Sequence, residues 1–166
     1  ALVQTCRELR DRAVAFGKEI DGGKEGGAED AMAVVCFTHE GGEGGRNKEN
    51  QDAFFAASPE PGVDIFGVFD GHGKQFGRLA GRVAADSCRA FLCAHSRWLR
   101  DEPEEALRFT FGLAHAAIRD GILSSGKGIR EQEGVLLQWD ADEAAWDTVD
   151  GGTTATIAVF LGDTRL

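Results

Sequence analysis

Apolar positions follow two different spacings in the central part of this chain, and each spacing predicts one kind of element. From Val63 to Phe69 almost every residue is apolar, which is typical of a buried β-strand. From Phe76 onward apolar residues recur at steps of three and four, which predicts an amphipathic helix over 73–95. The pattern therefore predicts a strand and a helix that are joined by a tight turn at residues 70–73.

The same helical spacing predicts two further helices. One covers residues 2–20, and the glycine-rich segment 21–27 ends it, because glycine pairs are unfavourable inside a helix. The other begins near Asp101, which can cap a helix, has Pro103 in its first turn and is expected to stop at Gly121. The two long helices that follow the turn predict an antiparallel pair packed on a sheet.

Three other segments have the composition of strands. Residues 32–38 and 52–57 are expected to pair across a glycine-rich loop. Residues 153–161, rich in Thr, Ile and Val, give the clearest strand pattern of the chain. Residues 134–139 predict a short apolar anchor, whereas the acidic stretch 140–150 predicts no regular element.

The predicted central strand is apolar on both faces. Val63, Ile65 and Phe69 alternate onto one side, while Phe66 and Val68 alternate onto the other. A strand of this kind is expected to be covered on both sides, as in a sandwich or a layered fold of helices and sheets.

Composition bounds the class of protein. With 166 residues, 42% of them hydrophobic and 28% charged, the chain has the size and composition of one soluble globular domain. A net charge of −10 without any cluster of Lys and Arg argues against nucleic acid or an anionic membrane as a partner. No apolar run approaches the roughly twenty residues of a membrane span. The four cysteines show no paired spacing, which predicts a reducing, intracellular compartment such as the cytoplasm or the nucleus.

The turn Asp70-Gly71-His72-Gly73 is the clearest candidate for a functional site in the sequence. A carboxylate placed where a buried strand leaves the core is costly unless a positive group meets it, and Mg²⁺ and Mn²⁺ prefer hard oxygen ligands. Gly71 lets the backbone bend so that its carbonyl can face the same ion, and His72 would then stand close enough for proton transfer. The residues alone leave open a simpler alternative, a turn in which Asp70 caps the following helix.

The spacing argues against a nucleotide-binding loop at this turn. Gln75 follows Lys74 where a phosphate loop needs Ser or Thr. Phe76 occupies the third glycine position of the dinucleotide fingerprint. A metal-binding turn therefore explains Asp70, Gly71, His72 and Gly73 better than a nucleotide-binding loop does.

Asp52 is a second candidate ligand for a metal ion. It precedes the strand predicted at 52–57, and two carboxylates at the ends of neighbouring strands can converge on one binuclear site. The alternative is that Asn50 and Asp52 only terminate a loop.

Three segments then follow one another in a recognisable order: Glu49-Asn-Gln-Asp52-Ala-Phe-Phe, Gly67-Val-Phe-Asp70-Gly-His72-Gly and Gly152-Thr-Thr-Ala155. Together they resemble the first conserved segments of the metal-dependent serine/threonine protein phosphatases of type 2C. The resemblance assigns residues 31–166 to the N-terminal part of that family's catalytic domain, after an N-terminal helix and linker at 1–30. It implies an α+β fold, an antiparallel β-sandwich flanked by helices in α-β-β-α layers, which is incomplete in this chain.

The resemblance also implies an activity, the dephosphorylation of phosphoserine and phosphothreonine proteins by water activated on two Mg²⁺ or Mn²⁺ ions. Asp70 would bridge the ions, Gly71 would contribute its carbonyl oxygen, and Asp52 would hold metal-bound water. His72 would be the general acid that protonates the departing alkoxide. Arg46 would bind the substrate phosphate.

Two departures from the family pattern qualify these expectations. Gln51 stands where many members have Glu, and the family's remaining metal aspartates lie in the C-terminal half, which this chain lacks. Asp147 or Asp150 could serve a third ion, and Lys48 could compete with Arg46 for the phosphate. The 166 residues alone are therefore expected to bind metal weakly and to be inactive.

Two further expectations concern partners. Exposed strand edges in an incomplete fold predict pairing or swapping with another copy of the chain. The rival to the enzyme hypothesis is a non-catalytic, phosphatase-like module that binds other proteins through the same fold.

Overall fold

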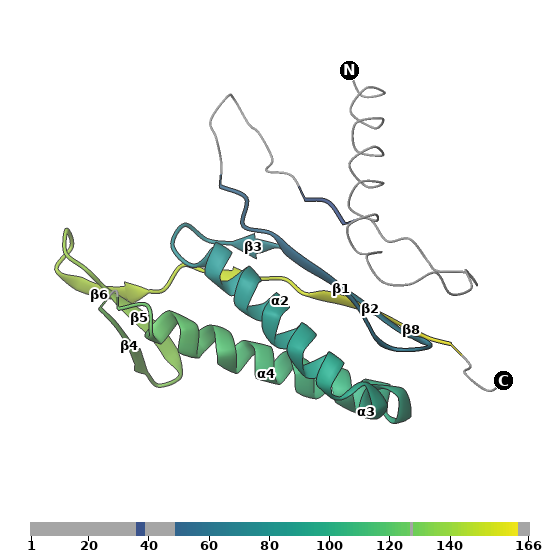
Figure 1. The fold of residues 1–166 in the computed structure, drawn as a ribbon. Coiled ribbons are helices and arrows are strands. Elements are labelled where there is room, and N and C mark those ends of the chain that lie inside the picture. Colours follow the sequence, from purple (N-terminus) through teal and green to yellow (C-terminus); the bar gives the residue numbers. More distant parts are fainter. Residues whose placement is uncertain (1–35, 39–48, 127, 163–166) are drawn as a thin grey trace, which may run out of the picture. The chain divides into compact units, whose positions relative to one another are not determined.

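The computed structural model describes residues 36–38, 49–126 and 128–162. The chain divides into two compact units, Ala1–Phe37 and Thr38–Leu166, and all the helices and strands that are described belong to the second. Within the described residues this unit is of mixed α+β type, with three small antiparallel sheets and three helices (Figure 1). The helix and linker predicted at 1–30 lie outside the described residues.

The largest sheet has three antiparallel strands in the order β1-β2-β8, which are Ala53–Glu60, Val63–Phe69 and Thr156–Leu161. β1 and β2 form a hairpin, and Gly62 in its turn takes φ +74°, a conformation that glycine adopts without strain. β8 pairs along the other edge of β2. The predictions of a central strand and of a strand within 153–161 are confirmed.

The described neighbour of β1 is β2, which occupies one of its two edges. The pairing of 52–57 with 32–38 that the sequence predicted involves residues that lie mostly outside the described part. Residues 32–35 lie outside the described part, and 36–38 carry no strand. The short connection of β1 to β2 explains the pairing, because a two-residue link favours an antiparallel hairpin.

Three helices follow the central strand: α2 (Gly77–Ala94), α3 (Ser96–Asp101) and α4 (Pro103–Leu123). α2 packs on the sheet, and α4 lies beside α2 in the opposite direction, as the sequence predicted (Figure 1). None of the helices in the described ranges is long and apolar enough to cross a membrane.

Two helix boundaries differ from those predicted, and both involve glycine. α2 begins at Gly77 rather than at Gly73, because Gly73 takes φ +102°, which is not a helical conformation. α4 continues through Gly121 instead of stopping there. A Cβ atom at that position would lie 3.4 Å from Leu79 Cδ2 on α2, which is an ordinary van der Waals contact, so Gly121 faces α2 without being required by the packing of the two helices.

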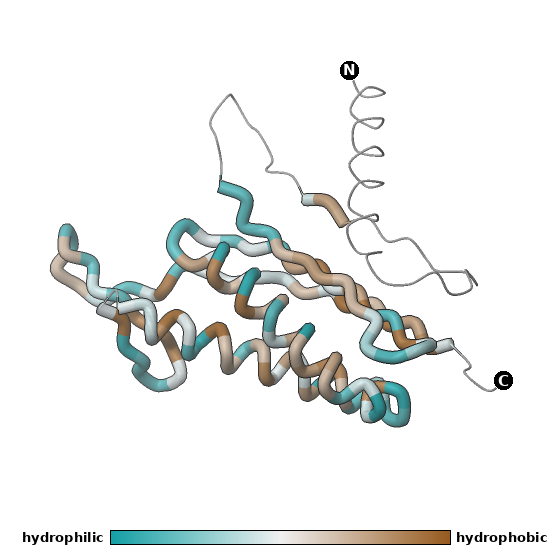
Figure 2. The backbone as a smooth tube through the Cα atoms, viewed as in Figure 1, coloured by the Kyte–Doolittle hydropathy of each residue, from teal (hydrophilic) through white to brown (hydrophobic). Residues whose placement is uncertain are grey.

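The core lies between α2 and the inner face of the sheet. Val63, Ile65 and Phe69 of β2 are completely buried and share one hydrophobic cluster with Cys88 and Leu92 of α2. Figure 2 shows apolar stretches along the strands and along α2 and α4. Full burial of one side chain of this size contributes about 1.5–3 kcal/mol, so this layer supplies much of the fold's stability.

The opposite side of the sheet, here called the open sheet face, carries Phe54, Phe66, Val68 and Phe160. Val68 is 59% exposed and Phe160 is 57% exposed. The rings of Phe66 and Phe160 pack edge to face, with their centroids 5.7 Å apart. The expectation that the central strand is covered on both sides is therefore not met within the described residues.

Two smaller sheets complete the described fold. β3 (Gly71–His72) pairs with β7 (Gly152–Thr153), and β4 (Ile129–Gln132), β5 (Val135–Asp140) and β6 (Ala145–Thr148) form a meander. The meander replaces the apolar anchor and the unassigned stretch of the prediction.

Cross-strand contacts hold the meander together. The ring centroids of Trp139 and Trp146 lie 5.6 Å apart, and the guanidinium of Arg130 lies 3.9 Å from the centroid of the Trp146 ring. Arg119 of α4 pairs with Glu131 of β4, and this hydrogen-bonded partner holds the pKa of the Glu131 carboxyl below its ordinary value. The ion pair ties the meander to α4.

The thiol of Cys88 gives a direct test of the core. Burial raises its pKa from 9.0 to about 11, so the neutral thiol favours the folded state fully below pH 9, and this contribution is lost as the pH rises through 11. At pH 8 we expect iodoacetamide to modify the exposed Cys36 and leave Cys88 unmodified until urea unfolds the protein. Equal rates of alkylation at the two residues, measured by peptide mass spectrometry, would contradict the packing described.

Candidate functional site

The β1–β2 ladder ends at the two candidate carboxylates. Its last pair is Ala53 opposite Phe69, so Asp52 and Asp70 are the next residues on the two strands. Paired residues of an antiparallel ladder project to the same face, and the alternation puts this pair on the side of Val68 rather than that of Phe69. Both aspartates are exposed. The register thus brings the two predicted ligands to one corner of the sheet.

The backbone of Asp70 is fixed by Thr154. The Asp70 N–H donates to Thr154 Oγ1 at 3.3 Å, and the Thr154 N–H donates to the Asp70 carbonyl at 2.9 Å. The next residues, Gly71 and His72, pair with β7. The carboxylate of Asp70 makes no hydrogen bond or ion pair within the described residues, so it is free to bind a ligand.

The glycines of the turn allow backbone segments to approach closely. A Cβ atom on Gly71 would lie 2.5 Å from the carbonyl oxygen of Gly77 and closer still to that of Gln51. Gln51 Nε2 donates a hydrogen bond of 2.9 Å to the Gly73 carbonyl. The amide of Gln51 therefore braces the turn, and a carboxylate in its place could not donate this bond.

Asp52 is positioned by two neighbours. Its N–H donates to Asn50 Oδ1 at 3.0 Å, and Thr38 Oγ1 donates to Asp52 Oδ2 at 2.8 Å. Asn50 Nδ2 also donates to Thr38 Oγ1 at 3.2 Å. The network orients one carboxylate oxygen of Asp52, while Oδ1 has no hydrogen bond within the described residues.

His72 lies against the backbone of β7. A Cβ atom placed on Gly152 would be 2.8 Å from His72 Nε2 and 3.2 Å from Cε1, so the imidazole rests where only a glycine leaves room for it. The ring is exposed. The imidazole is therefore accessible from solvent.

We expect Gly152→Ala to displace the His72 ring while the fold survives. The ring is an exposed, mobile side chain, so Tm should change by less than about 2 °C, whereas the chemical shift of the His72 Cε1 proton should move clearly. The matched control is Gly151→Ala, whose Cβ would lie 2.5 Å from Cβ of the buried Phe76. That variant should lose stability instead, and equal melting temperatures for the two variants would argue against this geometry.

The alternative role of Asp70 as a helix cap is wrong. α2 begins at Gly77, its N-cap residue is Phe76, and no side chain caps it. Asp70 lies six residues before that N-cap and makes no capping hydrogen bond to the first turn of α2. Asp101 likewise makes no cap for α4, whose N-cap is Glu102.

The remaining predicted residues divide into those described and those not. Arg46 and Lys48 lie outside the described residues. Asp150 Oδ2 accepts a hydrogen bond from the Lys74 N–H at 3.1 Å, and Asp147 Oδ1 accepts one from the N–H of Thr148. Asp150 thus supports the turn, a role that the sequence pattern did not reveal.

The oxygen atoms at this corner of the sheet are of the type that binds a divalent cation, but there are too few of them among the described residues. Carboxylate oxygens of Asp52 and Asp70 and a backbone carbonyl at Gly71 are the ligands that Mg²⁺ and Mn²⁺ prefer. Across the described residues, however, no group of three or more His, Cys, Asp or Glu side chains is placed to hold a metal ion. Further ligands would have to come from elsewhere.

Thr154, Gln51 and Asp150 are functional neighbours that reasoning from the sequence did not single out for this role. Each supports the backbone of the turn through a hydrogen bond across a long sequence separation. The Gly-Gly-Thr-Thr segment before Ala155 was the signal in the sequence that could have pointed to Thr154.

No family model matches this chain, and searches of curated proteins and of solved structures likewise return no match.

Proposed function

We propose that this chain is the N-terminal part of a metal-dependent serine/threonine protein phosphatase of type 2C, arranged in that family's sandwich of two sheets between helical layers. The observation that carries the proposal is the register at the end of β1 and β2, which makes Asp52 and Asp70 the next residues on two paired strands, with His72 two residues further along the chain. The open sheet face is consistent with a second sheet that packs there when the domain is complete.

In this proposal Asp70 and Asp52 hold Mg²⁺ or Mn²⁺ together with the Gly71 carbonyl. Bound divalent cations would supply an activated water and would neutralise charge on the phosphoryl oxygens. The hydrogen bonds of Thr38 and Thr154 keep the two aspartates in place without using the carboxylate of Asp70. One carboxylate oxygen of Asp52 and the backbone of Asp70 are thus held in place before any ion binds.

His72 supplies the proton that the leaving group needs. As water attacks phosphorus, the bond from phosphorus to the serine or threonine oxygen breaks, and that oxygen takes a proton from the imidazolium. The products are the free hydroxyl and inorganic phosphate. Arg46 remains the proposed group for binding the substrate phosphate.

The experiment compares two proteins on a phosphothreonine peptide and on p-nitrophenyl phosphate. One is this chain, and the other, the longer protein, is the chain joined to the C-terminal half of the catalytic domain that the proposal implies. We expect phosphate release only from the longer protein and only with Mn²⁺ or Mg²⁺, because the described residues provide too few ligands alone. Turnover by the 166 residues, or release that persists in EDTA, would contradict the proposal. An inactive longer protein would favour the non-catalytic, partner-binding module.

A further inference from the structure

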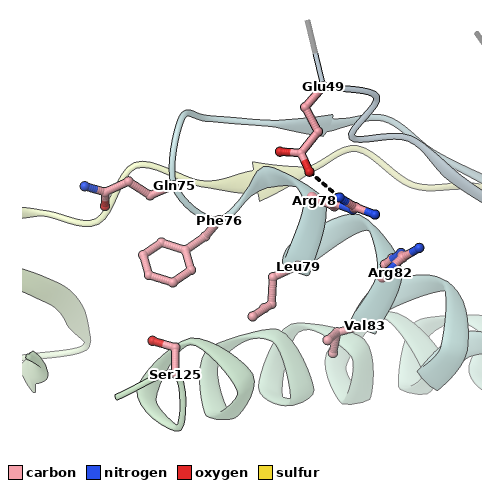
Figure 3. Close-up of a pocket in the computed structure, with 8 residues that line it drawn as sticks. All are labelled: Glu49, Gln75, Phe76, Arg78, Leu79, Arg82, Val83 and Ser125. Atoms are coloured by element: carbon pink, nitrogen blue, oxygen red, sulfur yellow. Dashed lines mark hydrogen bonds and ion pairs between the residues drawn. The ribbon is translucent and has the colours of Figure 1, made fainter. Parts of the chain in front are cut away.

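A groove of about 480 Å³ runs between the first half of α2 and the end of α4, beside the Asp70 turn. Figure 3 shows the residues that line it: Glu49, Gln75, Phe76, Arg78, Leu79, Arg82, Val83 and Ser125. Phe76 is almost completely buried, and Leu79 and Val83 are partly buried. These three side chains give the groove an apolar floor, which favours a ligand with an apolar side chain.

Two arginines one helical turn apart stand over this floor. Arg78 is already paired with Glu49, as the dashed line in Figure 3 marks. Arg82 forms no ion pair or hydrogen bond within the part of the chain that the structure describes, and Asp86, one turn further on, does not pair with it. A protein of net charge −10 thus presents an unpaired cation beside an apolar groove.

Ser125 adds an unsatisfied polar group at the other wall. Its Oγ atom is buried and has no hydrogen-bond partner among the residues that the structure describes, and Figure 3 shows the residue at the end of α4, across from Phe76. Leaving such a hydroxyl unpaired destabilises the fold, and most buried polar groups in proteins are paired. A ligand that reaches this wall with a polar group would satisfy it.

We propose that this groove docks a peptide segment of a partner protein in which an aliphatic or aromatic side chain stands near an Asp or Glu. The apolar side chain would lie on Phe76, Leu79 and Val83, and the carboxylate would pair with Arg82 as Glu49 pairs with Arg78. A peptide N–H or carbonyl would meet the Ser125 hydroxyl. This inference is independent of the proposed catalytic function.

The experiment selects random twelve-residue peptides displayed on phage against the full chain, and then measures their affinity as synthetic peptides by fluorescence polarisation. We expect the selected sequences to share an acidic residue near Leu, Ile or Phe. Arg82→Gln should weaken binding at least about tenfold, since it removes a charge-assisted hydrogen bond. Arg89→Gln is the matched control, because Arg89 is an exposed arginine of the same helix outside the groove, and it should leave the affinity unchanged.

Ser125→Ala separates docking from folding. Removing an unsatisfied buried hydroxyl should raise the melting temperature slightly, whereas the loss of its contact to the peptide should lower the affinity. Selected peptides without an acidic residue, or affinities that Arg82→Gln does not change, would overturn the proposal, as would a selection that enriches nothing. A concentration-dependent dimer that Arg82→Gln abolishes would assign the groove to a second copy of the chain instead.

Discussion

Gly71→Ala is expected to be the most destabilising single substitution in the site. The added Cβ would meet the carbonyl oxygens of Gln51 and Gly77, which are backbone atoms that no side-chain rotation can move away. Overpacking of this kind typically costs about 1–3 kcal/mol, and two backbone contacts place this variant at the upper end. The loss should appear as a melting temperature lower by roughly 10 °C.

Urea unfolding followed by circular dichroism measures this change. Gly112→Ala is the control, because Gly112 is an exposed residue of α4 and a Cβ there has no atom within 4 Å. That variant should gain up to about 1 kcal/mol from better helix propensity. If the two variants have the same midpoint, the close approach of strand, turn and helix around Gly71 is incorrect.

If the proposed function holds, Asp70→Asn is expected to abolish the proposed metal-dependent activity without unfolding the protein. The carboxylate makes no hydrogen bond or ion pair within the described residues, so its loss should leave the melting temperature unchanged. An amide in place of the carboxylate removes the negative charge that would hold the cations, whose contribution to the transition state is several kcal/mol. The expected fall in kcat/KM is therefore about a thousandfold.

This measurement uses the longer protein of the proposed function, together with Mn²⁺. Asp86→Asn, a change of the same chemistry at an exposed position of α2, should keep full activity. An Asp70→Asn variant that retains a tenth or more of the rate would remove the carboxylate from the mechanism. Loss of activity together with loss of folding would show that Asp70 has a structural role instead.

The sequence predicted the elements whose signals are local. The apolar run at 63–69 and the helical spacing after it gave β2 and α2, because burial against one core dictates both patterns. Their boundaries were less accurate where glycine decided them. Gly73 reads as a helix start in sequence, yet its positive φ serves the turn. Gly121 reads as a helix end, yet α4 continues through it and packs on α2.

The meander β4-β5-β6 was missed because its support is not local. Glu133 and Gly134 both take positive φ, a turn that is usually signalled by Asn or Asp before glycine. The contact between Trp139 and Trp146, and that of Arg130 on Trp146, join residues of different strands. A predominantly polar and acidic stretch that relies on such pairs carries little periodicity.

The sequence identified the residues of the candidate site but not the hydrogen bonds and strand register that position them. Asp52, Asp70 and His72 are marked by residue type and by their place at strand ends. The expectation that Asp52 and Asp70 follow the ends of neighbouring strands agrees with the β1–β2 register, whereas the exact pairs could not be predicted from the sequence. Gln51, which stands where many members of the resembled family have Glu, donates to the Gly73 carbonyl, a bond that the sequence did not reveal.

Binding of Mn²⁺ at the sheet corner is the most direct test of the central claim. A ¹⁵N-labelled sample of this chain is titrated with Mn²⁺, and paramagnetic broadening of the backbone amide signals is recorded for the wild type, Asp70→Asn and Asp86→Asn. Even weak binding should broaden the signals of Asp52, Asp70, Gly71 and His72 first, in the wild type and in Asp86→Asn but not in Asp70→Asn. Broadening that begins elsewhere in the chain, or that is the same in Asp70→Asn, would show that this aspartate does not hold the ion.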